Sequence, residues 1–472
     1  MQWRITILLV LIAALGVFAV VFFVKPGSRT SRAMEPQALI GEGLPINDVV
    51  RIKVTLDEGS AFAFERHDGQ WMQVEPLAYP MKPDSMRRFA QLAAELDVLY
   101  ELPARKVTAE ERQQMGLEPP RAILELGWGA DGQLTLLLGE NPFAGRAYIQ
   151  IAGDEKVHVV NQDLHQHVLD RHPNDWRTQS LFDRIDVDID HIDRIDEGQR
   201  TKLQRNQDGW QLALPVESQV DRSTLENFVQ ALSEIRASGF ALDHPSDDDL
   251  ALFGLDEPSA ELEIAWTEIE EVDGAINRIG NSQTLLVGAG VGDGSLDRYG
   301  MVLGRPVVIR LSEASLRGLR LPAPYFARRT GTGVPASDIT GIEIDVQESK
   351  FRIDRRINRT TGAVEWFDAD QPEHRASLEL VNELINQIAQ VKATDIHLVA
   401  DESIAEFIVG QVILYGIGGR PVDTVRLLSL PDKEGQVHWA LENYDGVLRI
   451  LPSSMNLLVS PQLLGLPKPG SP

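Results

Sequence analysis

The chain has 472 residues, and a typical domain of about 150 residues makes three domains the first expectation. Hydrophobic residues make up 43% and charged residues 24%, so the composition excludes a disordered chain and a polytopic membrane protein. The formal net charge of -25 disfavours nucleic acid as a partner, because an acidic surface repels phosphate backbones. With no cysteine, the chain cannot form disulfides, hold zinc or iron–sulfur clusters through thiolates, or use a cysteine nucleophile.

A continuous apolar segment lies close to the N-terminus. Between Ile5 and Val24, Thr6 is the one polar residue and no residue is charged. These twenty residues match the length that a helix needs to cross about 30 Å of hydrocarbon. A cleaved signal peptide is the alternative, because Val17-Phe18-Ala19 offers a small-residue cleavage site, but the apolar run exceeds the usual core of about 7–15 residues. We therefore predict a transmembrane helix over 5–24 that holds the protein in a lipid bilayer.

The charges beside this segment leave its orientation open. Basic residues lie on both sides of it, at Arg4, Lys25, Arg29 and Arg32. A long domain behind a single N-terminal span can be translocated regardless of its charge, so we expect residues 1–4 in the cytoplasm and the bulk of the chain across the membrane. Residues 25–44 are rich in Ser, Pro and Gly, and we predict that they form a flexible tether.

One sequence pattern then occurs three times. A Trp ends a short polar turn at Trp71 and Trp210 and, more loosely, at Trp366. Fifteen residues after each Trp, apolar residues begin to follow the spacing of one buried helix face. Ser223 with Glu226 forms a capping box that predicts the start of the second helix. The three stripes are Met86, Phe89, Ala90, Ala93 and Leu96; Leu225, Phe228, Val229, Leu232 and Ile235; and Val381, Leu384, Ile385, Ile388 and Val391.

A glycine follows each predicted helix at a matching distance. Gly116, Gly254 and Gly410 lie 45, 44 and 44 residues after their Trp, and in the first two copies a Pro follows closely, which indicates a turn. These two copies also share a Thr-Leu-Leu-x-Gly strand, at 135–139 and at 284–288. Three matching sets of spacings make chance alignment of hydrophobic patterns an inadequate explanation.

Strand patterns at short, hairpin-like spacing open and close each copy. They predict antiparallel sheets with one main amphipathic helix per copy, which is the α+β class. The second copy carries an acidic insertion around Glu268 to Asp273. The predicted organisation is a cytoplasmic N-terminus at 1–4, a transmembrane helix at 5–24, a tether at 25–44, repeats at 45–182 and 183–335, a degenerate repeat at 336–460, and a tail at 461–472.

The densest acidic segment, 183–197, opens the second repeat. Its spacing imitates an EF-hand loop, but His191 occupies the position where the sharp turn needs Gly. Ile185, Val187 and Ile189 alternate as in a strand with one buried face. We interpret the segment as a solvated strand edge rather than a calcium site. The imitated ligand positions are Asp186, Asp188, Asp190 and Glu197.

The remaining candidate sites have plain structural interpretations. His165, His167 and His172 are close in sequence, but helix residues two apart face different ways, so we expect an exposed helix end rather than a metal site. The glycine-rich segment 288–294 lacks a P-loop lysine and a following helix, which favours a mobile hairpin loop. The equivalent placement of the three Trp residues favours packing over ligand stacking. Asn358-Arg359-Thr360 matches a glycosylation sequon.

Known catalytic motifs are absent from the sequence. It contains no Gly-x-Ser-x-Gly elbow, Walker loop or His-Glu-x-x-His helix, and no carboxylate can be nominated as an acid or base. We therefore expect a non-enzymatic protein, and we nominate no catalytic, cofactor-binding or metal-binding residue and no cofactor.

The turn, helix and glycine motifs resemble the bacterial family named domain of unknown function 4340. The resemblance extends from Met1 to about Leu458 and is closest at 68–71, 116–120, 135–139, 208–210 and 254–258. The third repeat departs from the pattern, since it lacks Asp-Gly before Trp366 and prolines after Gly410. The resemblance implies a single-span envelope protein of the cytoplasmic (inner) membrane, with its bulk on the periplasmic side, associated with ABC transporters of the gliding-motility type.

Three functions remain open at this point. The first is an accessory or scaffold subunit of an ABC-transporter-type membrane complex, contacting permease or related subunits, because tandem repeats offer extended surface and an anchor confines them near a partner. The second is an envelope protein that binds a ligand in a groove between repeats. The third is a hydrolase that uses a pair of carboxylates.

Overall fold

The computed structural model describes residues 37–40, 43–103, 107–142, 145–182, 185, 189–207, 209–272, 275–292, 294–347, 349–431 and 437–467. The predicted N-terminus and transmembrane segment (1–24), most of the predicted tether and the last five residues lie outside this part of the chain. Within it, every helix is too short or too polar to cross a bilayer. The chain divides into two compact units, residues 1–178 and 179–472.

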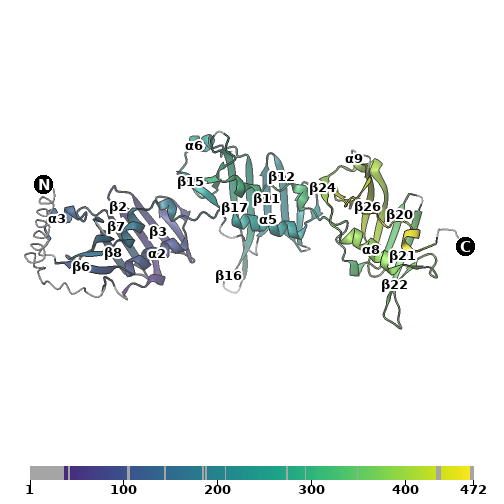
Figure 1. The fold of residues 1–472 in the computed structure, drawn as a ribbon, viewed down its shortest axis with the longest axis horizontal. Helices are drawn as coiled ribbons and strands as arrows, with labels where there is room; N and C mark the ends of the chain where they lie inside the picture. Colours follow the sequence, from purple (N-terminus) through teal and green to yellow (C-terminus); the bar gives the residue numbers. More distant parts are fainter. Residues whose placement is uncertain are drawn as a thin grey trace, which may run out of the picture. The chain divides into compact units, whose positions relative to one another are not determined.

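The first unit contains one ten-stranded antiparallel sheet (Figure 1). Its first strand, β1, comes from the predicted tether and pairs with β6, Gln37 opposite Val98 and Ala38 opposite Asp97. The strands are β1 (Gln37–Ala38), β2 (Val49–Leu56), β3 (Ala61–His67), β4 (Gln70–Glu75), β5 (Tyr79–Pro80), β6 (Asp97–Leu102), β7 (Ala122–Trp128), β8 (Gly132–Leu138), β9 (Arg146–Ile151) and β10 (Val157–Asn161), and the helices are α2 (Pro83–Ala94), α3 (Ala109–Gln114) and α4 (Asp163–Leu169).

The second unit contains two nine-stranded antiparallel sheets. The first of them comprises β11 (Ile189–Asp196), β12 (Gln199–Asn206), β13 (Gly209–Leu214), β14 (Ser218–Gln219), β15 (Ala237–Asp243), β16 (Ala260–Val272), β17 (Ala275–Gly290), β18 (Arg298–Val302) and β19 (Val307–Leu311), with α5 (Arg222–Glu234), α6 (Asp247–Leu252) and α7 (Glu313–Arg317). The other comprises β20 (Gly341–Val346), β21 (Ser349–Ile357), β22 (Val364–Asp368), β23 (Arg375–Ala376), β24 (Asp395–Leu398), β25 (Ile408–Tyr415), β26 (Pro421–Pro431), β27 (Val437–Glu442) and β28 (Val447–Ile450), with α8 (Leu378–Ala389) and α9 (Asp401–Ile404).

The three sheets share one strand order. Counted from β2, β11 and β20 as the first strand of each copy, the order across every sheet is 4-3-2-1-6-7-8-9-5. β1 adds an extra edge strand in the first copy alone. Three antiparallel sheets with few helices confirm the predicted α+β class and are consistent with tandem repeats. The sequence patterns missed one strand directly after each main helix (β6, β15 and β24) and the short helix that follows it (α3, α6 and α9).

Each main helix buries the apolar stripe that its sequence predicts. In α2 and the residues after it, all five stripe residues from Met86 to Leu96 are buried. In the other two copies, Val229 and Val391 are half-buried and the remaining stripe residues are buried. The predicted cap of the second helix is wrong: α5 begins at Arg222, and Asp221 caps it by accepting a hydrogen bond from the Thr224 backbone N–H. A carboxylate there also interacts favourably with the positive end of the helix dipole.

The glycine turn and the Thr-Leu-Leu-x-Gly strand are parts of one contact. Gly116 and Gly254 both have a φ of +64°, which favours glycine. The carbonyl oxygen before each turn glycine, on Met115 or Phe253, accepts a backbone hydrogen bond of 2.7 Å from the end of the strand. A Cβ on Gly139 or Gly288 would collide with that same carbonyl oxygen. Glycine at both positions therefore lets the turn dock on the strand.

The predicted equivalence of Gly410 is wrong. Gly410 lies inside β25 opposite Val346, at the register that Ala122 and Ala260 occupy in the other copies. The third copy enters this strand from α9 through a 3-10 turn, Ala405–Phe407, instead of a left-handed glycine. Equal spacing in sequence therefore did not reflect equal structure here.

The three Trp residues occupy equivalent strand positions. Trp71 and Trp366 are buried in the cores of their copies, and Trp210 is half-buried. An arginine lies directly opposite each Trp on the neighbouring strand: Arg66, Arg205 and Arg355. Arg66 and Arg355 donate to backbone carbonyls of the segment that leads into the first strand of their copy, at 3.2 and 2.8 Å. This recurring Arg–Trp pair was not predicted from the sequence.

A buried ion pair connects the two sheets of the second unit. Arg449 of β28 is 0% exposed and binds Asp445 with nitrogen–oxygen distances of 2.5 and 3.0 Å. The same guanidinium donates to the carbonyl oxygen of Arg328, in the connection between the two copies, at 2.7 Å. Ser218 of β14 donates to Asp445 at 2.7 Å. Nearer the surface, Lys392 reaches the cap of α5, Asp221, at 3.1 Å.

We predict that Arg449→Met lowers the free energy of unfolding of the second unit by about 3–5 kcal/mol, because it leaves the Asp445 carboxylate, whose side chain is 12% exposed, without its cation. Lys392→Met, which removes a half-exposed partner, should cost less than about 1 kcal/mol. Urea titration of the two variants measures both values. Equal losses of unfolding free energy in the two variants would contradict the conclusion that the Arg449–Asp445 pair stabilises the contact between the two sheets more than Lys392 does.

Candidate functional site

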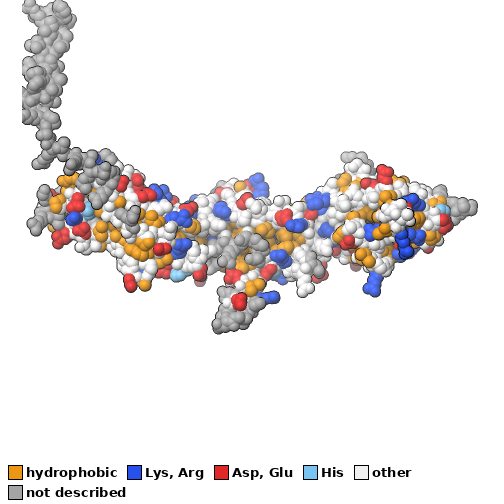
Figure 2. Space-filling model, turned by 90° about the horizontal axis from the view of Figure 1, so that it is seen from below, with side chains coloured by type: hydrophobic (Ala, Val, Ile, Leu, Met, Phe, Trp, Pro, Cys, Tyr) orange, Lys and Arg blue, Asp and Glu red, His pale blue; other side chains and the backbone are white. Residues whose placement is uncertain are grey.

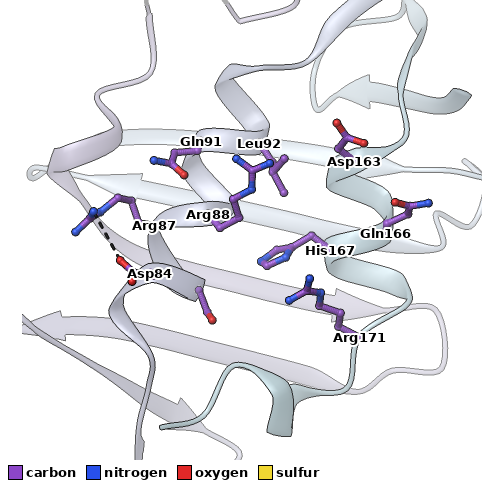
Figure 3. Close-up of a pocket in the computed structure, with 10 residues that line it drawn as sticks. Asp84, Arg87, Arg88, Gln91, Leu92, Asp163, Gln166, His167 and Arg171 are labelled. Atoms are coloured by element: carbon purple, nitrogen blue, oxygen red, sulfur yellow. Dashed lines mark ion pairs between the residues drawn. The ribbon is translucent and has the colours of Figure 1, made fainter. Parts of the chain in front are cut away.

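A hollow of about 550 Å³ lies between α2 and α4 of the first unit (Figure 3). The apolar stripe of α2 and the buried Leu164 and Val168 of α4 face the sheet. The polar sides of the two neighbouring helices therefore face outward, and the hollow lies between them. Arginine is the most frequent residue type in its lining. The lining residues are Asp84, Ser85, Arg87, Arg88, Gln91, Leu92, Asp163, Gln166, His167 and Arg171.

The arginines of the hollow are weakly paired. Arg87 approaches Asp84 of the same helix at 3.8 Å, and Arg88 approaches Glu95 at 3.5 Å. Arg171, just after α4, forms no ion pair within the described part of the chain. In Figure 3, Arg88 and Arg171 lie on either side of His167, whereas Arg87 turns toward Asp84. Several guanidinium N–H groups therefore remain available for hydrogen bonds to a ligand.

His167 is the most buried polar residue of the hollow. Its side chain is 5% exposed, and its ring packs edge-on against Phe89 at 4.5 Å between centroids. Its Nε2 atom has no hydrogen-bond partner among the described residues. Burial, aided by the positive charge of Arg171, lowers the pKa of His167 to about 4, so the ring is neutral near pH 7.

The expectation of an exposed helix end around these histidines is wrong. His165 is buried as well, and its Nε2 contacts the carbonyl oxygen of Tyr148 at 2.8 Å. Burial lowers its pKa to about 4. His172 alone is exposed, and its Nδ1 accepts a hydrogen bond from the Asn174 backbone that caps a 3-10 turn. The two rings are buried against different neighbours, His165 against β9 and His167 against Phe89 of α2. Across the described residues, no group of three or more potential ligands is arranged to hold a metal ion.

The acidic segment that opens the second repeat forms a central strand. Asp183, Arg184 and 186–188 lie outside the described residues, so the first two imitated EF-hand positions have no structural test. The interpretation as a strand edge is wrong, since β11 pairs with β12 on one side and β16 on the other. Asp193 of this strand is buried and accepts three hydrogen bonds from Arg200, at 2.6, 3.0 and 3.2 Å. Its role is structural.

Two further sequence candidates also have local roles. The glycine-rich segment continues the end of β17 into a turn, with Gly292 and Gly294 at positive φ, and residue 293 lies outside the described residues. The Asn358 side chain accepts hydrogen bonds from the backbones of Thr360 and Thr361, within the β21–β22 connection. The structure brings none of these residues together with the α2–α4 hollow. Adjacent Arg87 and Arg88, on the polar face of a predicted helix, were the one available sequence signal for that hollow.

We predict that acid destabilises the first unit between pH 6.5 and pH 4. His165 and His167 bind protons more weakly in the folded protein than in the unfolded chain, so their contribution is complete above pH 6.5 and is lost as pH falls toward 4. Each group contributes a slope of up to about 1.4 kcal/mol per pH unit. Urea titrations of the full chain at several pH values measure this dependence of the unfolding free energy on pH. Pulsed hydrogen exchange in peptides from α4 reports the unfolding of the first unit.

The double variant His165→Gln/His167→Gln should flatten this pH dependence. His397→Gln, which removes an exposed histidine of β24, is the matched control and should leave it unchanged. A double variant with the slope of the parent protein would contradict the assignment to these two rings.

Comparison with known proteins identifies the family but no activity. The family model described as "Domain of unknown function (DUF4340)" matches residues 71–249 and 210–406. No curated protein matches the chain. A solved structure described as "Ca2+-stabilized adhesin helps an Antarctic bacterium reach out and bind ice" is 9% identical, covering 87% of this chain and 83% of that chain, and its TM-score of 0.07 is too low to carry an argument. Because the family model spans well over half of the residues, the chain belongs to the DUF4340 family.

Proposed function

We propose that this protein is a non-enzymatic, membrane-anchored envelope protein that serves as an accessory or scaffold subunit of an ABC-transporter-type complex. Residues 5–24 would cross the bacterial inner membrane once and leave the repeats on the periplasmic side. The apolar sequence of that segment supports the anchor. The tandem sheets support the scaffold, since each of them offers surface to a partner.

The observation that carries the scaffold proposal is the hairpin of β16 and β17. β11 pairs with β16 only between Ala260 and Trp266, whereas β16 and β17 stay paired up to Val272 and Ala275. The outer half of the hairpin therefore projects beyond its sheet (Figure 1). The corresponding strands of the first copy, β7 and β8, have seven residues each, so the repeat fold does not require the extension.

Apolar side chains on the projecting hairpin lack a core beneath them. Ile269 is 68% exposed and Ile279 is also exposed, with Arg278 opposite Ile269 and Glu271 nearby. Ile279 lies opposite Glu268, so the two isoleucines are on opposite faces of the hairpin and each offers a separate apolar contact to a partner. A strand pair can also extend its hydrogen bonding to a partner strand. We propose that the hairpin docks on a subunit of the membrane complex.

The surface charge is in line with a protein partner rather than nucleic acid. On the face drawn in Figure 2, Lys and Arg side chains lie among Asp and Glu side chains. The formal net charge of -25 further opposes binding to phosphate backbones.

We expect a reporter that is active only in the periplasm to be active when it is fused after Pro472. Activity follows if residues 1–4 are cytoplasmic and the remainder is translocated. The same reporter fused to a chain that lacks residues 5–24 should be inactive. An expressed but inactive full-length fusion would reverse the topology.

We expect affinity purification of the full chain in mild detergent to recover ABC permease subunits. Ile269→Ser/Ile279→Ser should reduce this recovery at least tenfold, because it removes the exposed apolar residues of the hairpin. Ile357→Ser, at a 64% exposed position of β21, controls for loss of surface apolar area and should not reduce it. Recovery of the chain without permease subunits, in several detergents, would refute the scaffold role.

A further inference from the structure

The arginines of the α2–α4 hollow are not required by the repeat fold. Met86, Leu225 and Val381 are the equivalent first stripe residues of the three main helices. The two positions after them are Arg87 and Arg88 in the first copy, but Glu226 and Asn227 in the second and Asn382 and Glu383 in the third. The equivalent helices of the second and third copies therefore pack on their sheets without arginine at these positions. Packing does not require Arg87 and Arg88, and they are available for another role.

The cations of the hollow also retain unused hydrogen-bonding capacity. Arg88 donates to Glu95 only at 3.5 Å, the outer limit of a hydrogen bond, and the two side chains are about half exposed. Arg171 has no carboxylate partner in the described part of the chain. A guanidinium presents five N–H donors in a planar fork that suits the oxygens of phosphate. The concentration of two such groups is notable in a chain with a formal net charge of -25.

His167 supplies a second, independent observation. It projects from α4 toward α2 between Arg88 and Arg171 (Figure 3), and it lines the hollow although it is 5% exposed. Its Nε2 has no hydrogen-bond partner among the described residues. That atom is enclosed by protein, so a ligand in the hollow would meet the remaining accessible edge of the neutral ring, between the two cations.

We propose that the hollow binds a phosphate ester, with Arg88 and Arg171 donating hydrogen bonds to the phosphate oxygens on either side of the His167 ring. Asp84 and Asp163, which also line the hollow, can accept hydrogen bonds from hydroxyl groups of the ester. The volume of about 550 Å³ lies within the usual range for small-molecule sites. The ligand is thus a phosphate that carries a hydroxylated substituent, either free or as a lipid headgroup. This site is independent of the scaffold proposal.

The test uses the full chain in a non-ionic detergent and isothermal titration calorimetry. The probes are glycerol 3-phosphate and short-chain phosphatidylglycerol. Short-chain phosphatidylcholine is the control lipid, because its headgroup carries no hydroxyl group. We expect saturable binding of at least one of the first two probes, weakened at least tenfold by Arg88→Gln/Arg171→Gln. Arg222→Gln, which removes a highly exposed arginine from the equivalent helix α5, is the matched control and should bind like the parent chain.

The outcomes separate the two sources of the phosphate. Binding of glycerol 3-phosphate supports a free ester, and binding of phosphatidylglycerol alone supports a lipid headgroup. Binding of neither probe overturns the proposal, and so does binding that the double variant retains. Because Arg88 and Arg171 are exposed, the variant should keep the parent's thermal midpoint, which circular dichroism checks. Equal binding of phosphatidylcholine and phosphatidylglycerol would refute recognition of the hydroxylated substituent.

Discussion

Burial of one helix stripe against one face of an antiparallel sheet is the constraint on which all three repeats depend. The main helices contribute three to five buried apolar residues each to the core of their copy, and the strands alternate buried and accessible side chains beneath them. A fully buried residue of this kind contributes about 1.5–3 kcal/mol. The stripe therefore decides which face of the sheet carries the main core, while smaller buried clusters form beside α6 and α9 in the second and third copies.

The repeat organisation was accessible from sequence because it rests on spacing that packing enforces. The Trp-to-helix distance and the helix stripes mark elements that recur in all three copies. The strand after each helix was not predicted, because it is short and its exposed residues, such as Leu99 and Tyr100, hide the alternation. The prediction of a glycine turn at Gly410 was wrong for a different reason. The third copy makes this turn without a left-handed residue, and the residue 44 positions after Trp366 lies in a strand instead.

The α2–α4 hollow lay beyond sequence reasoning because it joins residues about 80 positions apart. α2 and α4 contact each other on the sheet that both helices cover, as Phe89 and His167 show, and no local sequence pattern indicates this contact. The burial of His165 and His167 was likewise hidden, since a seven-residue helix with two histidines looks polar until β10 fixes its orientation. Comparing the copies makes up for this in part. Where a feature recurs, as with Arg66 and Trp71, the shared fold accounts for it.

The pairing of β1 with β6 sets a limit on reach. Gln37 and Ala38 pair with β6 in the first sheet. The linker between that sheet and the proposed membrane helix is therefore limited to residues 25–36. Twelve residues span at most about 40 Å even when fully stretched. A force applied to the proposed anchor would act first on the edge strand β1, whose two residue pairs with β6 would bear the load before the core of the sheet.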